Sequence, residues 1–386
     1  MIAITIGIIA EFNPLHRGHQ RLITAAKSRD DSCVVVLSSN FTQRGSPSLT
    51  DKFTRTRTAL DAGADLVLEL PVLYSCSAAQ DFARGAVNLL ARTHFAGSLA
   101  FGMESPEWDL AGLVRAEESG SFREALRVEL GRGASYPKAY GLALESVVRG
   151  AGEFVSHPNN MLALSYAREV LRNNYALKVF PVKREGVFSS RVIREDVARN
   201  VDMLPEFSRR ILEEAEESGR VSDESRLWPV LQGALIRSNA EDLRRIHGID
   251  EGIEGLLLKN SRINRTCSIF LGACVCARYT RAHIRRRLIY ILLGLDRWEV
   301  RGALRGGVPY ARVLGFTRRG REILRKCAKD SEVKIITRLT EAEGRVGKYF
   351  AEIEYRASRL YELTVKNPNI NNESQRPVIY NSENHL

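Results

Sequence analysis

The stretch ITIGIIAEFNPLHRGHQRL, residues 4 to 22, contains the pattern that decides the fold of this chain. It includes most of an apolar run, Ile2 to Ile9, that is typical of a buried strand, and it leads into a helical pattern from Gln20 to Lys27. The loop between them carries an asparagine, a proline and two histidines, His16 and His19. A strand followed at once by a polar loop and a helix is typical of the ligand-binding turns of α/β proteins.

The loop after the first strand is suited to bind phosphate. Ligands bind beyond the carboxyl ends of the strands in such sheets, and a helix N-terminus offers unpaired N–H groups and a partial positive charge. His16 and His19 can each donate a ring N–H to phosphate oxygens, and Gly18 lets a flat base approach the backbone. A histidine pair alone is weak evidence, and its spacing is not that of a helical zinc site. The whole strand, loop and helix pattern favours a bound nucleoside triphosphate.

The first half of the chain alternates between strand and helix patterns. Further apolar, β-rich runs occur at Cys33–Leu37, Leu66–Leu70, Leu99–Gly102 and Leu177–Val182. Helical patterns between them occur at Lys52–Ala62, Ala78–Ala91 and Asn160–Arg172. This alternation predicts an α/β fold with a doubly wound, Rossmann-like parallel sheet whose strands are covered on both faces.

The character of the chain changes after Arg194. A helical insertion is predicted at about residues 107–151, and from Pro205 onward the sequence is mostly helical, polar and basic, without strand alternation. We therefore predict an α/β domain at residues 1–200, a helical, arginine-rich domain at 201–366 and a tail at 367–386. The tail is rich in asparagine and contains two prolines, so we expect a strap over the surface or partial disorder.

Positive charge is concentrated in one segment. The 386 residues carry a net charge of +11, and residues 259–326 alone contain 17 Lys or Arg and 3 acidic residues, an excess of 14. Fifteen of these 17 cations are arginine. A solvated basic face without a partner is the common explanation of a charge run, but this density favours binding of a nucleic-acid backbone.

The composition also narrows the class of protein. No apolar run approaches the roughly 20 residues of a membrane span, and we expect no membrane partner. The N-terminus lacks a basic leader and a cleavage site. None of the six cysteines forms a CxxC pair, which indicates reduced thiols and a cytoplasmic location. Cys274 and Cys276 are poorly spaced for zinc, so we predict no metal site there. The sequence specifies no oligomeric state.

Two motifs resemble the HxGH nucleotidyltransferase superfamily, whose members form adenylates from ATP. EFNPLHRGH, residues 11 to 19, resembles its first signature. FSSRVIRE, residues 188 to 195, resembles its second, with Ser189, Ser190 and Arg194 in place. Arg191 stands where that signature has a threonine, so the role of the threonine hydroxyl is not matched.

Other stretches resemble the bacterial tRNA(Met) cytidine acetate ligase family. They are SSNFTQRGSPSLTDKFTRTRTALDAGADLVLELP (38 to 71), LAFGMES (99 to 105), SHPNNMLALSYA (156 to 167), FPVKREG (180 to 186), YTRAHIRRRLIYILLG (279 to 294) and YARVLGFTRRGREIL (310 to 324). The resemblance implies that acetate and ATP form acetyl-adenylate and pyrophosphate. It further implies transfer of the acetyl group to N4 of the wobble cytidine of elongator tRNA(Met), forming N4-acetylcytidine.

The resemblance also implies a set of site residues. His16 and His19 are the implied catalytic pair, which binds phosphate and stabilises charge at the α-phosphorus. Gly102 is expected under the adenosine, and an Asn of the PNN turn either caps a helix or contacts the nucleotide. The expected ATP-binding residues are Gly7, Ile8, Ile9, Ala10, Glu11, Phe12, Asn13, Pro14, Leu15, His16, Arg17, Gly18, His19, Gln20, Gly102, Asn159, Asn160, Arg184, Ser190 and Arg194.

Several charged residues near the expected loops have open roles. Arg44, Lys52 and Arg55 are candidate phosphate ligands, tRNA contacts or solvated surface cations. Mg²⁺ is expected with the phosphates, and Asp51 and Glu104 are candidates to help hold it, without a catalytic role for either. For Asp51 a role as helix N-cap is the stronger interpretation.

The arginine-rich half is predicted to bind tRNA. Apolar residues at helical spacing between Ile284 and Leu295 form one stripe with an arginine margin, which is also the pattern of an ordinary surface helix. The expected backbone contacts are Arg278, Arg281, Arg285, Arg286, Arg287, Arg318 and Arg319. Because the cytidine must leave its stack, aromatic or arginine stacking partners are also expected.

Two other functions remain open at this stage. A small-molecule adenylyltransferase would explain the histidine loop but not the arginine-rich half. A tRNA-binding protein that has lost activity would explain the arginines without chemistry.

Overall fold

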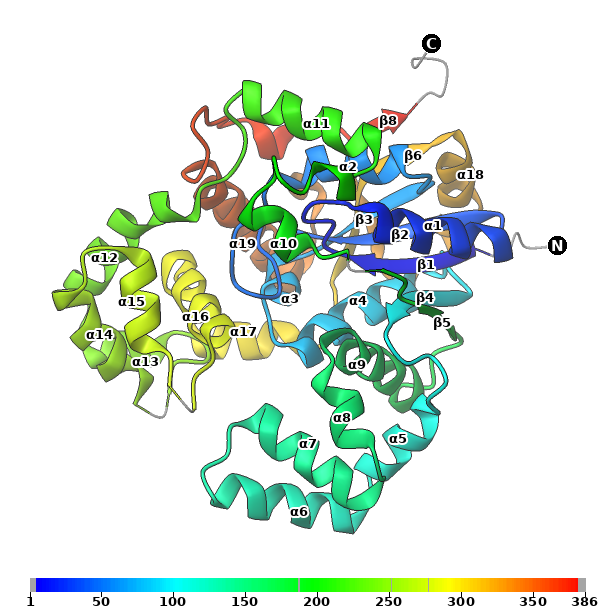
Figure 1. Ribbon diagram of the computed structural model, residues 1–386. Helices are drawn as coiled ribbons and strands as arrows, with labels where there is room; N and C mark the ends of the chain where they lie inside the picture. Colours follow the sequence, from blue (N-terminus) through cyan, green and yellow to red (C-terminus); the bar gives the residue numbers. More distant parts are fainter. Residues whose placement is uncertain (1–4, 187, 251, 277, 381–386) are drawn as a thin grey trace.

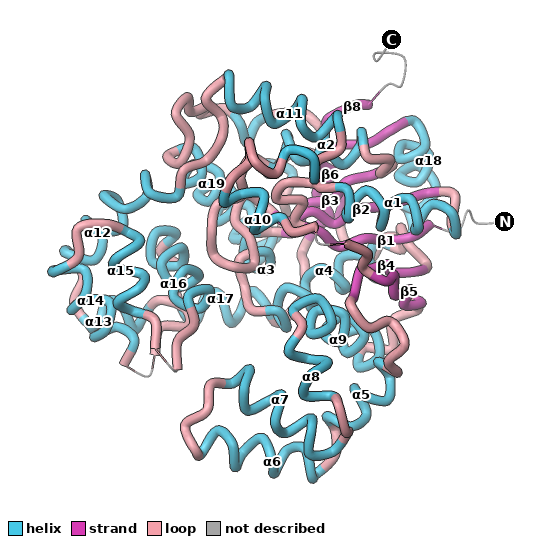
Figure 2. The backbone as a smooth tube through the Cα atoms, viewed as in Figure 1, coloured by secondary structure: helices cyan, strands magenta, loops and turns pink. Residues whose placement is uncertain are grey.

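A computed structural model describes residues 5–186, 188–250, 252–276 and 278–380. Within these residues, eight strands form one sheet with helices on both faces (Figures 1 and 2). The strand order is β5-β4-β1-β2-β3-β6-β7, and β8 pairs with β6. The strands are β1 (Thr5–Ala10), β2 (Ser32–Ser38), β3 (Leu66–Leu70), β4 (Ser98–Met103), β5 (Lys178–Lys183), β6 (Tyr310–Thr317), β7 (Lys334–Ile336) and β8 (Val378–Tyr380).

The five predicted strands are present and pair in parallel. β1 pairs with β2 and β4, β2 with β3, and β4 with β5. Strands β1, β2 and β3 are buried throughout, because helices cover both of their faces, as the apolar runs predicted. β5 lies at the edge and is partly exposed. The part of the first predicted strand at residues 2–4 lies outside the described residues.

The helices form two layers around the sheet. On one face α1 (Arg17–Arg29) and α2 (Lys52–Asp61) pack on β1 and β2 through residues such as Ile23 and Leu60. On the other face lie α4 (Ala79–Thr93), α9 (Pro158–Arg172) and α19 (Gly344–Glu362). The remaining helices of this body are α3 (Val72–Ser75), α10 (Ser190–Glu195), α11 (Glu206–Glu217) and α18 (Arg318–Cys327).

Two helical lobes project from the sheet (Figure 1). The predicted insertion forms the first, with α5 (Leu110–Glu117), α6 (Gly120–Gly131), α7 (Tyr136–Val147) and α8 (Ala151–Ser156). The second contains α12 (Trp228–Arg237), α13 (Ala240–Arg245), α14 (Ile253–Ile263), α15 (Cys267–Cys274), α16 (Arg281–Leu293) and α17 (Arg297–Leu304). A separate core around Trp228, Phe270 and Ile284 holds α12 to α16 together. In the described residues, no helix is long and apolar enough to cross a membrane.

The residues after Pro205, predicted to be mostly helical without strand alternation, also contain strands that the sequence did not reveal. β6 pairs antiparallel with β3, and β7 and β8 pair with β6, so residues 310–380 return to the sheet of the N-terminal half. The predicted second domain, 201–366, therefore covers a helical lobe and part of the sheet body. Arg312 interrupts the apolar pattern of β6 although its side chain is buried, and that charge concealed the strand in the sequence.

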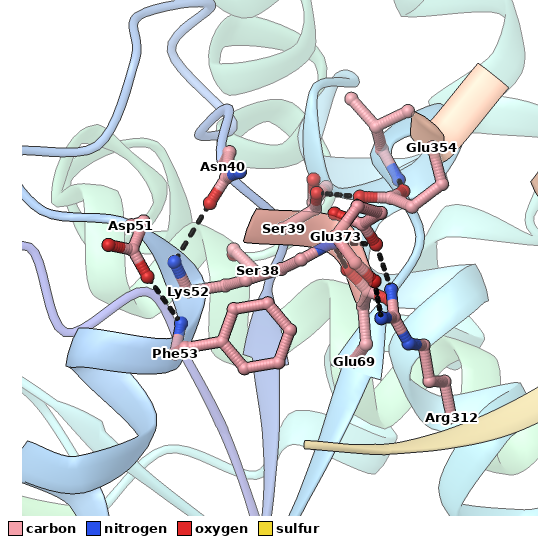
Figure 3. Close-up of polar contacts among 12 residues, drawn as sticks. Ser38, Ser39, Asn40, Asp51, Lys52, Phe53, Glu69, Arg312, Glu354 and Glu373 are labelled. Carbon is pink, nitrogen blue, oxygen red and sulfur yellow. Dashed lines mark hydrogen bonds and ion pairs between the residues drawn. The ribbon is translucent and has the colours of Figure 1, made fainter. Parts of the chain in front are cut away.

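Buried charges join the second half of the chain to the first (Figure 3). Lys52 of α2 pairs with Glu69 of β3, with Glu354 of α19 at 3.2 Å and with Glu373 at 2.9 Å. Arg312 of β6 pairs with Glu69 at 3.0 Å and also with Glu373. All five side chains are at most 3% exposed. The tail is therefore anchored in the body through Glu373, and is not only a surface strap.

Candidate active site

A cavity of about 610 Å³ lies at the carboxyl ends of β1, β4 and β5 and at the start of α1. In the strand order, β1 lies between β4 and β2. After β1 the chain first adds β2 and β3 on one side of it and then adds β4 and β5 on the other side, so the strand order reverses between β1 and β4. This is the switch point at which α/β sheets bind ligands, and the volume suits a nucleotide-sized molecule. The position agrees with the prediction made from the strand, loop and helix pattern.

The two histidines are three residues apart because they cap α1. His16 is the N-cap, and its Nδ1 accepts a hydrogen bond from the backbone N–H of His19 at 3.3 Å. In return, Nδ1 of His19 accepts a hydrogen bond from the backbone N–H of His16 at 3.3 Å. This is the geometry of a capping box, built here from two imidazoles. The rings stack with centroids 3.7 Å apart, and Phe12 holds His19 edge-on at 5.1 Å.

The cap determines which ring nitrogen can donate. Because both Nδ1 atoms accept hydrogen bonds, the single proton of each neutral ring is on Nε2. Burial, and then the charge of Arg184, lower the pKa of His16 to about 4. Burial, and then His16 and Arg184, hold the pKa of His19 well below its usual value of 6.5. Both rings are thus neutral Nε2–H donors at pH 7. Only His19 is among the residues that line the cavity, and His16 is 2% exposed beneath it.

We expect ¹⁵N NMR of histidine-labelled protein to show the Nε2–H form for His16 and His19 at pH 7. Neither ring should titrate between pH 8 and pH 5.5, because the folded-state pKa of each lies below the unfolded value. For His16 the same shift means that the stability it contributes is present above pH 6.5 and is lost as the pH falls toward 4, and the shift of His19 acts in the same direction. A midpoint near 6.5 for both rings would contradict the capping geometry.

The cavity brings together about half of the predicted ATP-binding residues. Those that line it are Ile9, Ala10, Glu11, Phe12, Asn13, Gly18, His19, Gly102, Asn159, Arg184 and Ser190. Those that are not among the lining residues are Gly7, Ile8, Pro14, Leu15, His16, Arg17, Gln20, Asn160 and Arg194.

Three of the residues outside the lining have structural roles. A Cβ on Gly7 would lie 2.8 Å from Leu90 Cδ1, so this glycine permits close packing on α4. Asn160 is fully buried, and its side-chain oxygen accepts hydrogen bonds from the backbone N–H groups of Glu104 and Ser105 at 2.9 and 3.2 Å. Arg194 donates to the backbone carbonyl of Asn13 and thereby supports the histidine loop from below.

Arg184 and Asn159 also line the cavity. A Cβ on Gly102 would lie 3.2 Å from Cγ of Arg184, so the absent side chain leaves room for that arginine. Arg184 Nε lies 3.7 Å from Oε1 of Glu104, and Asn159 donates to the same oxygen at 2.5 Å. Of the two asparagines left open by the sequence, Asn159 is the one in the cavity.

The acidic residues considered for Mg²⁺ are already engaged. Asp51 caps α2, accepting from the backbone N–H groups of Phe53 and Thr54 at 2.9 and 3.1 Å. Glu104 is held by Asn159, Asn160 and Arg184. In the part of the chain that the structure describes, no group of three His, Cys, Asp or Glu is placed to hold a metal. These residues do not form a protein-held Mg²⁺ site.

Lys52 and Arg55 are not surface or phosphate cations, which corrects those possibilities. Lys52 belongs to the buried charge cluster described above. Arg55 is 1% exposed and donates to the carbonyls of Glu11 at 2.7 Å and Ser39 at 2.7 Å. It thus ties the histidine loop to the end of β2. Arg44, in contrast, lines the cavity.

Several lining residues were missed from the sequence. Arg21, Leu22 and Ala25 follow Gly18 at helical spacing on α1, so periodicity was a usable signal for them. Phe82, Phe101, Leu162, Tyr166 and Phe188 also line the cavity and come from four other segments. These segments are distant in sequence, and only the fold brings the five side chains to the cavity.

The predicted tRNA-binding arginines do not form one group. α16 lies beside the cavity, because Arg286 donates to the carbonyl of Gln43 at 2.9 Å and Gln43 lines the cavity. Arg285 pairs with Glu224 at 2.7 Å, and Arg287 donates to the carbonyl of Gly248 at 2.6 Å. Arg281 is exposed at the start of the helix. Arg278 is also exposed. Arg318 and Arg319 lie on α18, on the opposite side of the molecule (Figure 1).

Comparison with known proteins agrees with this geometry over the whole chain. The profile of the family described as HIGH Nucleotidyl Transferase matches residues 4–376. A tRNA(Met) cytidine acetate ligase of Clostridium perfringens is 30% identical, with 97% of this chain and 99% of that protein covered. One from Thermoanaerobacter sp. (strain X514) is 32% identical, with 95% and 96% covered.

This chain belongs to the tRNA(Met) cytidine acetate ligase family of HIGH nucleotidyl transferases.

A solved structure has the same architecture as this family member. Thermotoga maritima TmcAL bound with alpha-thio ATP aligns with a TM-score of 0.90 at 27% identity, covering 97% of this chain and 99% of that one. The apo form of the same protein aligns with a TM-score of 0.89. The family resemblance inferred from the quoted stretches and the α/β nucleotidyltransferase fold are therefore confirmed.

Proposed function

We propose that this protein is an ATP-dependent ligase that activates acetate as acetyl-adenylate and transfers the acetyl group to N4 of the wobble cytidine of elongator tRNA(Met). The observation that carries the proposal is the neutral Nε2–H donor of His19 at the start of α1, inside a nucleotide-sized cavity that α16 borders. The family supports the same activity, since curated relatives that match nearly the whole chain carry this name.

In the first step, an acetate oxygen attacks the α-phosphorus of ATP and pyrophosphate leaves. His19 donates its Nε2–H to a phosphate oxygen, where negative charge increases in the transition state. Arg184, which also lines the cavity, neutralises phosphate charge with a planar guanidinium that suits two oxygens at once. The carboxylate is the nucleophile, so the protein supplies position and charge and no covalent intermediate of its own. No step is assigned to a protein-held metal, because the local carboxylates are engaged.

In the second step, N4 of cytidine attacks the carbonyl carbon of acetyl-adenylate, AMP leaves and one proton is released. The cytidine must reach the cavity out of its stack. The α16 side of the cavity is the entrance we assign to tRNA, because Gln43 and Arg44 line the cavity while their loop packs on the arginines of α16. The arginines give a positive field that draws the phosphate backbone toward the cavity mouth.

The experiment is to incubate the protein with ATP, acetate and elongator tRNA(Met), and to digest the tRNA for nucleoside mass spectrometry. N4-acetylcytidine should appear only when all three are present. Exchange of labelled pyrophosphate into ATP should require acetate and not tRNA. Exchange that needs a phosphorylated small acceptor would indicate an adenylyltransferase, and tRNA retention without exchange would indicate an inactive binding protein.

Neutralising Arg281 is expected to weaken tRNA binding and to reduce its dependence on salt. Arg281→Gln should lower the slope of log affinity against log salt by about one unit, since one phosphate contact is lost. Arg127→Gln is the control, because Arg127 is exposed on α6 of the other lobe. An unchanged slope for Arg281→Gln would remove this end of α16 from the tRNA surface.

A further inference from the structure

The three tryptophans of the chain have different surroundings. Trp228 is 7% exposed, packs on Phe270 and donates its indole N–H to the carbonyl of Arg265 at 2.9 Å. Trp108 is half-buried against Phe154, with ring centroids 5.0 Å apart. Trp298 is 71% exposed, the highest value among the large apolar side chains of the described residues. A single exposed apolar side chain is ordinary on a protein surface, so the surroundings of Trp298 decide whether it has a role.

Trp298 is presented on a rigid support. Asp296 caps α17, accepting from the backbone N–H groups of Trp298 at 2.8 Å and Glu299 at 3.1 Å. On the inner side of the helix Val300 and Leu304 are buried. The indole therefore projects from a fixed backbone rather than from a loop.

Arg301 and Arg305 lie on the same face of α17 as the exposed indole. The guanidinium of Arg301 lies over its ring, 5.4 Å from the centroid, and Arg305 follows at helical spacing and is exposed. Burial and then Arg287 lower the pKa of His247 to about 4, and Arg301 acts in the same direction. Arg301 therefore shares one positive field with Arg287 of α16.

The nearby acidic groups lie on another side of α17. At 3.6 residues per turn, Arg301 and Arg305 fall on the same side of the helix as Trp298, whereas Glu299 lies about 100° away from Trp298. In keeping with this, burial and then the charges of Glu299 and Asp296 raise the pKa of Tyr349 on α19 to about 12. The face of Trp298, Arg301 and Arg305 is thus aromatic and cationic. A base offers a flat π-face for the indole, and its phosphates offer charge for the arginines.

We propose that Trp298, flanked by Arg301 and Arg305, is a stacking platform for an unpaired base of tRNA. The proposal rests on the proposed function, which makes tRNA the substrate. The platform adds a contact with a base to the contacts that the arginines of α16 are proposed to make with the tRNA phosphate backbone. In this lobe the sequence located only arginines as tRNA-binding residues. α17 directly follows α16 in the chain, so one tRNA can lie across both helices (Figure 1).

The test measures binding of an anticodon stem–loop RNA and of a blunt RNA duplex of equal length to the full chain. Trp298→Ala should weaken stem–loop binding by about 10-fold and duplex binding by less than about twofold, because only an unpaired base can stack. Trp298→Phe should retain most of the affinity. Ile379→Ala, a change at another exposed apolar residue on β8, should have no effect.

Salt dependence and fluorescence separate stacking from charge. Trp298→Ala should shift the affinity without changing the salt slope, whereas Arg301→Gln should lower the slope by about one unit. The stem–loop should quench the fluorescence of the wild-type protein and not that of Trp298→Phe. Equal loss on both RNAs, or no loss on the stem–loop, would overturn the platform.

The same variants separate this inference from the proposed function. Acetate-dependent pyrophosphate exchange without tRNA should be unchanged in Trp298→Ala, because α17 contributes no residue to the lining of the cavity. If the wild-type protein acetylates tRNA and Trp298→Ala binds the stem–loop normally, the platform is wrong and the function stands. If the wild-type protein shows no such exchange, the proposed function fails first.

Discussion

His19→Ala is expected to lower the rate of acetate-dependent pyrophosphate exchange by about 10²- to 10³-fold. The substitution removes the one imidazole of the pair that lines the cavity, and with it a preorganised donor to the phosphate whose charge increases in the transition state. tRNA binding should change by less than about twofold, since the arginines and Trp298 lie on other elements. Exchange of labelled pyrophosphate and a filter-binding assay measure the two effects.

The controls distinguish catalysis from capping. His94→Asn changes an exposed histidine whose left-handed backbone, at φ 54°, asparagine tolerates, and its exchange rate should be normal. His16→Asn keeps a side-chain acceptor at the N-cap of α1, so the helix start is preserved. Exchange within about tenfold of wild type would make His16 a positioning residue. Normal exchange in His19→Ala would refute the role assigned to the loop.

Lys52→Met is expected to destabilise the fold by about 3–5 kcal/mol, the cost of leaving a buried carboxylate without its partner. Burial, and then the charge of Glu69, raise the pKa of Glu354 to about 8, so that carboxyl is mostly protonated at pH 7. Burial opposes ionisation of Glu373, but the charges of Lys52 and Arg312 outweigh it and lower the pKa to about 2. With Glu354 neutral, two cations balance Glu69 and Glu373. Removing Lys52 breaks that balance, and urea denaturation measures the loss.

Two substitutions test this charge balance. Glu354→Gln mimics the protonated carboxyl and should cost about 1 kcal/mol or less at pH 7. Arg57→Gln, on the exposed side of the same helix, breaks a pair with Glu214 in which both side chains are about half exposed, and should cost at most about 1 kcal/mol. Equal losses for Lys52→Met and Arg57→Gln would show that the cluster is not the anchor of the tail.

The pH dependence gives an independent check on Glu354. Its folded-state pKa is raised above its unfolded value, so its contribution to stability is present at low pH and is lost as the pH rises through about 8. The stability of Glu354→Gln relative to wild type should therefore improve between pH 6 and pH 9. A difference that does not change with pH would mean that Glu354 is ionised in the fold.

The sequence predicted most of the sheet because its strands are locally encoded. Leu66–Leu70 is a strand with the predicted limits, and the other four predicted strands are found within one or two residues over their described parts. β6 was missed because Arg312 lies in its middle, and the charges that compensate Arg312 are Glu69 and Glu373, distant in sequence. A pattern read along the chain detects apolar periodicity but not a partner that neutralises a buried charge.

In the candidate site, too, some residues were identified from the sequence, and the roles of others became clear only in the fold. His19, Gly18 and Glu11 were identified because strand, loop and helix are consecutive in the chain. Gly7 was assigned to the nucleotide, yet its missing side chain serves packing against Leu90. Arg55 was considered a loop cation, yet it is buried and binds four backbone carbonyls. A residue type shows what a side chain is able to do, while its neighbours decide what it does.

The sequence by itself determined the parallel sheet, the histidine turn at the head of α1 and the family, because each depends on residues adjacent in the chain or on matches along it. Only the tertiary structure decided that the histidines cap each other as neutral donors, that the tail carries a buried carboxylate into the body, and that α16 borders the cavity. The neutral state of the histidines depends on their burial and on the distant Arg184, and the other two features depend on groups far apart in sequence. The energies of such contacts arise when water is excluded, which happens only once the chain has folded.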